Sequence, residues 1–308
     1  MSAPSAYSPN RPARRVPDLS SSLELLKPIT WFAPMWAFAC GAVSSGVSWR
    51  GNWELILAGI ILAGPMVCAA SQAVNDWFDR HVDAINEPNR PIPSGRVPGL
   101  WGLIIAVFWT VMSLALGAAL GLWAFVATGV AVLLAWAYSA PPVRLKLNGW
   151  YGNAAVAVSY EGIAWFTGAA VLLQDLPGTP IIVLAALYSV GAHGIMTLND
   201  FKALEGDSRF GVRTLPIQLG TDRAAQLACV VMAVPQFVVV GYLAYLGAPY
   251  HAAFIVVLIA AQLWLMRTLL EAPITKAPWY NSTGTTLYVI GMLISAFAVR
   301  SIGLGGAP

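Results

Sequence analysis

Long apolar stretches, separated by short polar connections, dominate this chain of 308 residues. Each stretch has about 20 residues, the length that an α-helix needs to cross the hydrocarbon core of a bilayer. Backbone groups find no water inside a bilayer, so such stretches must form hydrogen-bonded helices. The spans are predicted at 28–48, 53–74, 99–119, 121–139, 152–173, 180–198, 224–246, 251–270 and 284–303. We therefore predict an all-α, polytopic membrane bundle of about nine transmembrane helices.

The composition also indicates a membrane protein. Hydrophobic residues make up 58% of the chain and charged residues only 10%, whereas about a quarter of a soluble domain is charged. Thirteen Trp and ten Tyr suit the two membrane interfaces. The three cysteines, Cys40, Cys68 and Cys229, form no metal or redox motif. The lipid bilayer is thus the expected partner, and no nucleic acid is expected.

The basic residues predict the orientation in the membrane. With the N-terminus inside, the connections at 75–98, 140–151, 199–223 and 271–283 all lie on the cytoplasmic side. Counting flanking positions, 15 of the 17 Lys and Arg residues then lie on that side, and only Arg50 and Arg300 lie opposite. Cytoplasmic loops of membrane proteins are rich in Lys and Arg, so this distribution favours a cytoplasmic N-terminus.

The two ends of the chain differ from the spans. Residues 1–22 are rich in Ser, Pro and Ala and predict a disordered cytoplasmic tail, since no apolar region follows the charges closely enough for a signal peptide. Residues 23–303 are predicted to form a single transmembrane domain, in which 23–27 begin an interfacial helix. Residues 304–308 form a second short tail.

An acidic cluster follows the second span. Residues 75–83 have the sequence NDWFDRHVD, in which Asp76, Asp79 and Asp83 have the spacing of one helix face and Asn75 lies one turn from Asp79. Carboxylates crowded on one face repel each other unless a cation lies among them. Mg²⁺ is a natural candidate, because it binds few protein carboxylates and completes its octahedron with water and phosphate oxygens. A solvated acidic helix end is the alternative.

A second copy of this motif lies in the other half of the chain. Residues 199–207 have the sequence NDFKALEGD, in which Asn199, Asp200 and Asp207 match the first motif, while Ala203 replaces one carboxylate and Glu205 adds another. Matching motifs predict one site between two repeat-related halves. The predicted metal ligands are Asp76, Asp79, Asp83, Asp200, Glu205 and Asp207. The predicted catalytic residues are Asn75, Asp76, Asp79, Asp83, Asp200 and Asp207.

A basic connection accompanies the acidic motifs. Residues 138–146 have the sequence YSAPPVRLK, where Arg144 and Lys146 alternate with apolar residues and so share one side of an extended segment. Ordinary cytoplasmic loop charges are the alternative. An anion held by both metal ions and cations suggests a diphosphate. The predicted substrate-binding residues here are Arg90, Tyr138, Arg144, Lys146, Asn199 and Lys202.

Two ionisable residues lie inside spans, where a group facing lipid would be costly. Glu161 is therefore expected to face the bundle interior. His193 lies about a turn and a half before Asn199, and either bonds between helices or contacts a substrate. Both are predicted substrate-binding residues, placed beside an acceptor molecule in the cytoplasmic half of the bundle.

These parts together predict a chemistry. A diphosphate held at the edge of an apolar bundle can carry a prenyl tail that lies among the helices. Withdrawal of electron density into the bound diphosphate ionises the allylic carbon–oxygen bond. A dry, aromatic pocket protects the resulting cation until an acceptor nucleophile captures it.

The motifs also resemble a known family. Residues 25–303 are similar to the UbiA superfamily of intramembrane prenyltransferases, through the first acidic motif and the basic connection. Within it, the chlorophyll and bacteriochlorophyll synthases resemble the chain at SQAVND (71–76), DAINEP (83–88), RPIPSGR (90–96), NDFK (199–202) and EGD (205–207). The bacteriochlorophyll branch is similar at LKPITWF (26–32) and YEGIAWFTG (160–168).

The resemblance implies Mg²⁺-dependent esterification of the propionate of a (bacterio)chlorophyllide by geranylgeranyl or phytyl diphosphate. It also implies a place in the bacterial inner, photosynthetic membrane. Ala203 departs from the wider superfamily's pattern, which leaves the second metal cluster one carboxylate short. Two other functions remain open from the residues: a prenyltransferase acting on an aromatic or quinone precursor, and a cation-coupled secondary transporter.

The acidic motifs give a first testable prediction. Asp79→Asn is expected to nearly abolish turnover without unfolding the bundle, because it removes a metal ligand but keeps the side chain's shape. Ala203→Asp, the matched control, is expected to be tolerated because it restores the repeat. The measurement is initial rate with and without EDTA. Activity that survives both Asp79→Asn and chelation would contradict the metal hypothesis.

Overall fold

The computed structural model describes residues 16–305, which are helical and contain no β-strand. In chain order the elements are α1 (Leu19–Leu26), the 3₁₀ turn η1 (Pro28–Thr30), α2 (Phe32–Ser44), α3 (Trp53–Ile61), the π-helical η2 (Leu62–Cys68), α4 (Ala69–Asn86), α5 (Trp101–Ala119), α6 (Leu122–Ser139), η3 (Leu145–Leu147), α7 (Gly149–Ala157), the π-helical η4 (Val158–Ile163), α8 (Ala164–Leu173), α9 (Thr179–Asn199), η5 (Asp200–Lys202), α10 (Leu204–Arg209), α11 (Leu215–Leu219), α12 (Thr221–Tyr245), α13 (Pro249–Glu271) and α14 (Pro273–Ser301).

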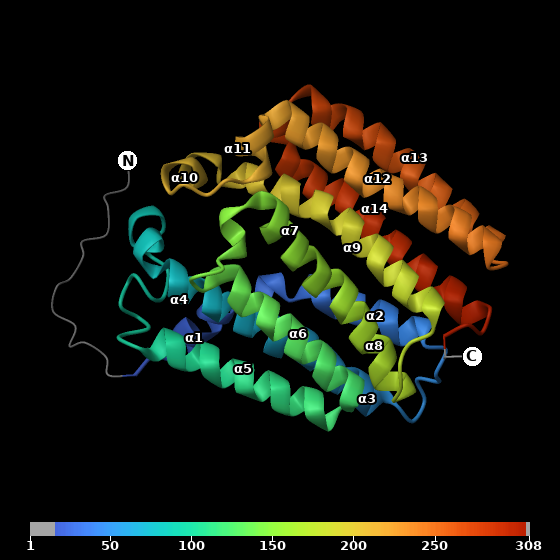
Figure 1. Ribbon diagram of the computed structural model, residues 1–308, viewed down its shortest axis with the longest axis horizontal. Helices are drawn as coiled ribbons and strands as arrows, with labels where there is room; N and C mark the ends of the chain where they lie inside the picture. Colours follow the sequence, from blue (N-terminus) through green and yellow to red (C-terminus); the bar gives the residue numbers. More distant parts are fainter. Residues whose placement is uncertain (1–15, 306–308) are drawn as a thin grey trace.

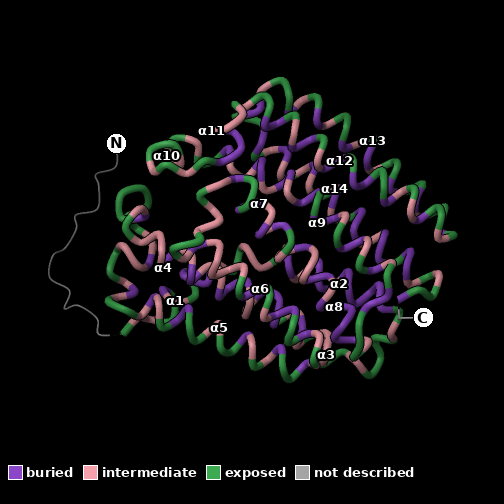
Figure 2. Tube along the Cα trace, viewed as in Figure 1, coloured by how far each residue is buried: buried purple, intermediate pink, exposed green. Residues whose placement is uncertain are grey.

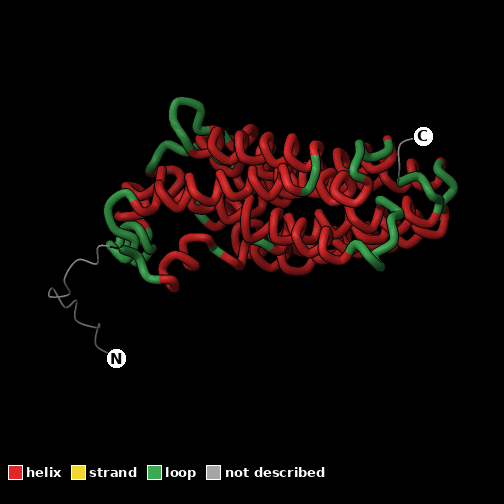
Figure 3. Tube along the Cα trace, turned by 90° about the horizontal axis from the view of Figure 1, so that it is seen from below, coloured by secondary structure: helices red, strands yellow, loops and turns green. Residues whose placement is uncertain are grey.

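The long helices lie side by side and their connections gather at the two ends of the molecule (Figures 1 and 3). In this part of the chain, eight continuous helices are long and apolar enough to cross a membrane, and the shorter helix Phe32–Ser44 occupies the first predicted span. The predicted all-α membrane bundle is therefore confirmed. The acidic motifs, α10 and α11 lie at one end, and the C-terminus lies at the other (Figure 1).

Burial differs between the central and peripheral helices (Figure 2). In the most apolar 18 residues of the helix Thr179–Lys202, 61% of the residues are buried, whereas the share is 28% in the corresponding parts of α5 and α13. The exposed residues of these outer helices include Phe108, Val111, Phe254 and Trp264. Apolar side chains facing outward suit contact with lipid, since lipid tails are as apolar as the side chains themselves.

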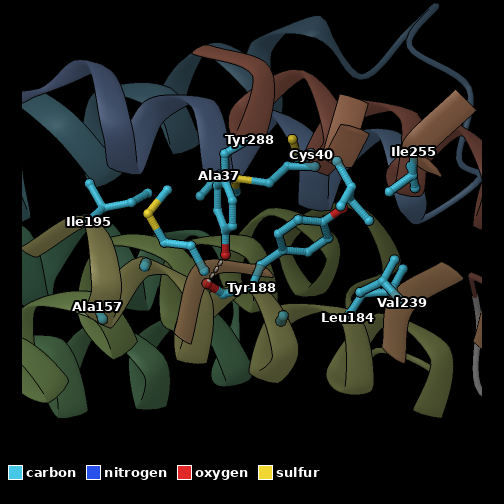
Figure 4. Close-up of a cluster of buried hydrophobic side chains, with 14 of the residues drawn as sticks. Ala37, Cys40, Ala157, Leu184, Tyr188, Ile195, Val239, Ile255 and Tyr288 are labelled. Atoms are coloured by element: carbon cyan, nitrogen blue, oxygen red, sulfur yellow. Dashed lines mark hydrogen bonds between the residues drawn. The ribbon is translucent and has the colours of Figure 1, made fainter. Parts of the chain in front are cut away.

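Aromatic residues form the centre of the core around α9 and α14 (Figure 4). The ring of Tyr188 stacks on Trp165 with centroids 5.5 Å apart. The ring of Tyr288 lies edge-on to Tyr188, with centroids 5.3 Å apart. Both phenols are satisfied, because Tyr288 donates to the Tyr188 carbonyl at 2.6 Å and Tyr188 bonds Ser295 at 2.8 Å. Buried tyrosines need such partners, and here they join the helices in one fixed arrangement.

The first span is shorter than predicted. The 13 residues of α2 extend about 20 Å, less than the hydrocarbon thickness. The helix ends where the hydroxyl groups of Ser44 and Ser45 bond to carbonyls of its last turn. Arg300 from α14 then donates to the carbonyl groups of Val43 and Val47, at 3.5 and 3.1 Å. This bonding gives Arg300 a structural role at the end of the bundle away from the motifs.

The second span is one long helix, Trp53–Asn86, and the π-helical segment η2 forms part of it. Pro65 lies inside η2, where its missing N–H group prevents regular α-helical bonding. The indole of Trp109 donates to the Pro65 carbonyl at 2.8 Å. The helix then continues as α4 beyond the predicted boundary at residue 74, so the first acidic motif is helical as expected.

Two local expectations differ from the structure, and a third lies outside the described residues. The first helix begins at Leu19, capped by the Asp18 carboxylate, before the predicted boundary at residue 23. Residues 1–15 of the predicted tail lie outside the described residues. The predicted connection at 271–283 is mostly helix, because Pro273 begins α14 at a position where a helix needs no backbone donor.

The second acidic motif also differs from the first in its backbone. Asn199 ends α9, the turn η5 follows, and α10 begins only after a break at Ala203. Its side chains therefore do not share one continuous helix face. A short helix that includes Gly206 is intrinsically weak, which fits a motif whose position is set by the surrounding chain.

Candidate active site

A polar cavity of about 680 Å³ lies at the motif end of the bundle. Its lining combines residues from α4, α6, the basic connection, α7, α9 and α10. The predicted site residues that line it are Asn75, Asp79, Asp83, Arg90, Tyr138, Arg144, Lys146, Asn199, Asp200, Lys202, Glu205 and Asp207. The structure thus brings both motifs and the basic connection to one cavity.

The carboxylates of the first motif are paired with basic side chains. Asp79 lies 2.6 Å from Lys146 Nζ and 3.5 Å from Arg144 Nη2. Asp83 lies 2.9 Å from Arg90 Nη1. Protein cations therefore neutralise Asp79 and Asp83 in the structure.

Asp76 has a different place from its neighbours. It is only 2% exposed and does not line the polar cavity. Lys27 binds its Oδ1 at 2.6 Å, and Arg90 Nη1 lies 3.5 Å from the same atom. Its buried Oδ2 has no hydrogen-bond partner. Asp76 is therefore positioned to hold the basic side chains in place beside the cavity.

The second motif has no cationic partner in the described chain for Asp200 or Asp207. Asp200 accepts a hydrogen bond from Asn153 at 3.0 Å. Burial, and then the negative charge of Asp79, raise the pKa of Asp207 to about 6. Glu205 is mostly exposed and pairs with Arg209 on the same short helix. The second motif is the part of the cavity where negative charge is least compensated.

The donor atoms suit a hard cation such as Mg²⁺, although residues 16–305 contain no group of three or more His, Cys, Asp or Glu side chains close enough to enclose a metal ion. Mg²⁺ usually binds one or two carboxylates and takes its other ligands from water and substrate phosphates. Asp79 and Asp83 face the same cavity as Asp200 and Asp207. The residues therefore fit a metal ion that binds together with an anionic substrate.

Burial and neighbouring charges act in opposite directions on the pKa values of Lys146 and Arg90. Burial lowers the pKa of Lys146, and the nearby Asp79 opposes this effect. Burial would also lower the pKa of Arg90, but the hydrogen bonds to Glu87 and the charges of Asp76 and Asp83 outweigh it and raise the pKa. An anion entering the cavity meets cations that are already oriented by carboxylates.

A second cavity, of about 480 Å³ and mostly apolar, adjoins the first. Asn75, Tyr138 and Asn199 line both cavities, so they mark the junction. Asn75 donates to Ser139 Oγ at 3.2 Å, and Asn281 of α14 donates to Asn199 Oδ1 at 2.8 Å. A molecule with an anionic head and an apolar body can extend from one cavity into the other.

Glu161 and His193 line neither cavity. His193 Nε2 lies 3.2 Å from the Trp150 carbonyl, and its ring lies beside the Trp150 ring. Glu161 faces the interior as expected, and its buried Oε2 has no hydrogen-bond partner. The structure therefore places His193 in the interhelical contact that the sequence left open as its alternative.

Four residues at the site were missing from the sequence-based prediction. Lys27 and Asn281 come from distant ends of the chain, Ser139 lies within the basic connection, and Asn153 follows it. Lys27 had a signal as a basic residue directly before the first span, and Ser139 as a member of the basic connection. Asn153 and Asn281 have no charge and no motif, and only tertiary contacts bring them to the site.

The sequence matches the UbiA prenyltransferase family over residues 30–299. The chain belongs to the UbiA prenyltransferase family. A bacteriochlorophyll synthase 33 kDa chain of Cereibacter sphaeroides is 58% identical over 290 residues, which cover 94% of this chain and 96% of the relative. The bacteriochlorophyll synthase 34 kDa chain of Chloroflexus aurantiacus is 44% identical, covering 97% and 96%.

More distant relatives share the fold. The chloroplastic chlorophyll synthase of Arabidopsis thaliana is 36% identical, over 90% of this chain and 73% of the relative. A solved UbiA homologue from Archaeoglobus fulgidus, bound to GPP and Mg²⁺, superposes with a TM-score of 0.75 at 19% identity, covering 91% of this chain and 99% of that one. This UbiA family member is thus an intramembrane prenyltransferase whose helices follow the family's fold.

The buried ion pair of Asp76 gives a testable prediction. Lys27→Met is expected to lower the free energy of unfolding by about 2 kcal/mol, because it removes the basic side chain that lies nearest to the buried Asp76 carboxylate. Arg96→Met is the matched control. Its pair with Glu24 is exposed on both sides and contributes about 1 kcal/mol or less. Thermal unfolding in detergent measures both, and equal effects would contradict the role assigned to Asp76.

Proposed function

We propose that this chain esterifies the propionate of bacteriochlorophyllide with geranylgeranyl or phytyl diphosphate and releases diphosphate. The junction between a charged cavity and an apolar cavity carries this proposal, because it suits a donor with a diphosphate head and a long apolar tail. The tetrapyrrole acceptor is proposed from the names of the relatives that align over nearly the whole chain.

The polar cavity is proposed to bind the diphosphate. Arg144 can present two N–H groups to phosphate oxygens, and Lys146 supplies a compact charge. Arg90 adds positive charge to the cavity, while its N–H groups bond Glu87, Asp83 and Asp76. Asp79, Asp83, Asp200 and Asp207 would hold Mg²⁺ beside the diphosphate, as expected from the homologue bound to GPP and Mg²⁺. Bound Mg²⁺ would neutralise negative charge on the departing diphosphate.

The apolar cavity is proposed to keep the reacting carbon dry. The bond between C1 of the prenyl group and the diphosphate oxygen breaks, and its electron pair leaves with diphosphate. A new bond forms between C1 and a propionate oxygen of the acceptor. The propionate is already ionised at neutral pH, so the chain supplies orientation and needs no general base. Excluding water prevents hydrolysis of the activated prenyl group.

A cation-coupled transporter fits the structure less well. Such a protein is expected to bind its ions near the middle of the membrane. Here Asp79 and Asp83 lie in the last turns of α4, and Asp207 lies beyond the end of α9. A prenyltransferase acting on an aromatic or quinone precursor shares the same donor site, and only the choice of acceptor separates it from the proposed function.

The proposed location is the bacterial inner, photosynthetic membrane, with the site facing the cytoplasm. The distribution of Lys and Arg supports this orientation. Arg50 and Arg300 belong to the end of the bundle opposite the motifs, where Arg300 bonds the carbonyl groups that end α2. Diphosphate released at the cytoplasmic face would leave directly into water.

A direct assay tests the proposed reaction. Membranes containing the protein are incubated with bacteriochlorophyllide, geranylgeranyl diphosphate and Mg²⁺, and the ester is measured by chromatography. Ester is expected with Mg²⁺ and is expected to be lost with EDTA. A 4-hydroxybenzoate acceptor provides the comparison for the aromatic alternative. Prenylation of that acceptor alone, with no tetrapyrrole ester, would contradict the proposal.

The basic connection gives a further prediction. Arg144→Ala is expected to raise the KM for the prenyl diphosphate about tenfold or more, with little change for the acceptor, because a charged hydrogen bond to phosphate is lost. Arg267→Ala is the control, since Arg267 is also basic but does not line the polar cavity. Equal effects on the two substrates would mean that Arg144 does not bind the diphosphate.

A further inference from the structure

The apolar cavity, which is proposed to receive the prenyl tail, also opens toward the bilayer. Small side chains from several helices line it: Ala33, Ala63, Ala131, Ala135, Ala155 and Ala164. At one side Ile29 and Phe32 belong to the lining and are 90% and 59% exposed, so the cavity opens at the outer surface of the bundle. A flat apolar ligand could enter there from the bilayer.

One wall of this cavity carries a polar cluster. Tyr160 in η4 meets Cys68 at the end of η2 and Ser71 and Gln72 in the first turn of α4. The two π-helical segments of the bundle therefore meet at this point, one from each half of the chain. A π-helical segment shifts the register of its side chains and often marks a functional site. Here the shift places polar groups in a lining that is otherwise mostly apolar.

The hydrogen bonds of the cluster fix the orientation of Gln72. Ser71 donates its proton to the Cys68 carbonyl at 2.7 Å, so its oxygen can accept from Tyr160 at 3.4 Å. The Tyr160 oxygen in turn accepts from Gln72 Nε2 at 3.0 Å. The other end of the amide, Oε1 of Gln72, has no hydrogen bond to any described residue and belongs to a side chain that lines the cavity. A free carbonyl acceptor is thus held ready for a ligand.

Resting on the proposed function, we propose that Gln72 Oε1 is the axial ligand of the central magnesium of bacteriochlorophyllide. The macrocycle nitrogens bind the metal in the ring plane and leave its axial position open. Magnesium prefers oxygen ligands, and a neutral amide oxygen is one of them. The lining of this cavity contains no histidine or carboxylate, and His193 is bonded elsewhere.

The register of α4 supports this geometry. Gln72 precedes Asn75 by three residues, or about 4.5 Å along the helix axis. Asn75 marks the junction with the polar cavity, where the reacting end of the prenyl diphosphate is proposed to lie. A macrocycle whose centre is bound by Gln72 can therefore direct its propionate edge toward the junction.

The test compares bacteriochlorophyllide with its metal-free form, bacteriopheophorbide, in which two protons on the ring nitrogens replace the magnesium. Gln72→Leu is expected to weaken binding of bacteriochlorophyllide about tenfold and to leave binding of bacteriopheophorbide unchanged. Gln72→His, which restores a metal ligand, is expected to recover the preference for the metal-containing form. Binding is measured by fluorescence quenching with purified full-length protein in detergent.

Two controls separate ligation from a structural effect. Thr167→Val changes another lining residue, whose hydroxyl already donates to the Ile163 carbonyl, and is expected to keep the ratio of the two affinities. The absorption spectrum of bound bacteriochlorophyllide, which responds to axial coordination, is expected to change in Gln72→Leu and not in Thr167→Val. If Gln72→Leu does not fold, Gln72→Asn, which keeps the amide but shortens it, serves the same comparison.

The outcomes distinguish this inference from the proposed function. Ester formation by the unchanged protein, together with an equal loss of affinity for both ligands or no loss, would overturn the role of Gln72 and leave the function standing. Absence of the ester in the unchanged protein would overturn the proposed function itself. A loss confined to the magnesium-containing ligand, with the spectral change, would support Gln72 as its ligand.

Discussion

Neutralisation of the α4 carboxylates is the interaction on which the site depends. Three aspartates on one face of a helix that has just left an apolar bundle would repel each other strongly. Lys27, Arg90 and Lys146 bind them from three separate parts of the chain. The same ion pairs fix the segment before the first span, the loop after α4 and the basic connection. Charge balance at one helix end thus also organises the surrounding loops.

The two motifs differ in whether their carboxylates are paired with basic side chains. The first motif holds basic side chains in place, whereas Asp200 and Asp207 of the second motif have no such partners in the described chain. A diphosphate needs cations around it, and a metal ion needs carboxylates, which here come partly from the paired first motif and partly from the second. The arrangement provides both within one cavity. Loss of the carboxylate at Ala203 fits this division, because the second motif need not hold a basic connection of its own.

Irregular helix geometry shapes the apolar cavity. The π-helical segments η2 and η4 both contribute to its lining and meet through Cys68 and Tyr160. A regular helix would direct these side chains differently, since each π turn adds a residue to the register. Only the first segment has a visible cause in the sequence, at Pro65. The second contains Gly162, whose missing side chain lets Ser189 approach closely.

The sequence by itself determined the membrane class, the approximate spans, the helical first motif and the residues that meet in the polar cavity. It could do so because bilayer thickness fixes span length and because duplicated charges in an apolar chain have few compatible positions. Tertiary structure alone decided which charges pair, that Asp76 is buried behind the cavity, and that His193 lies outside both cavities. It also brought Asn153 and Asn281 to the site. These facts depend on contacts between distant helices, which local spacing and composition do not encode.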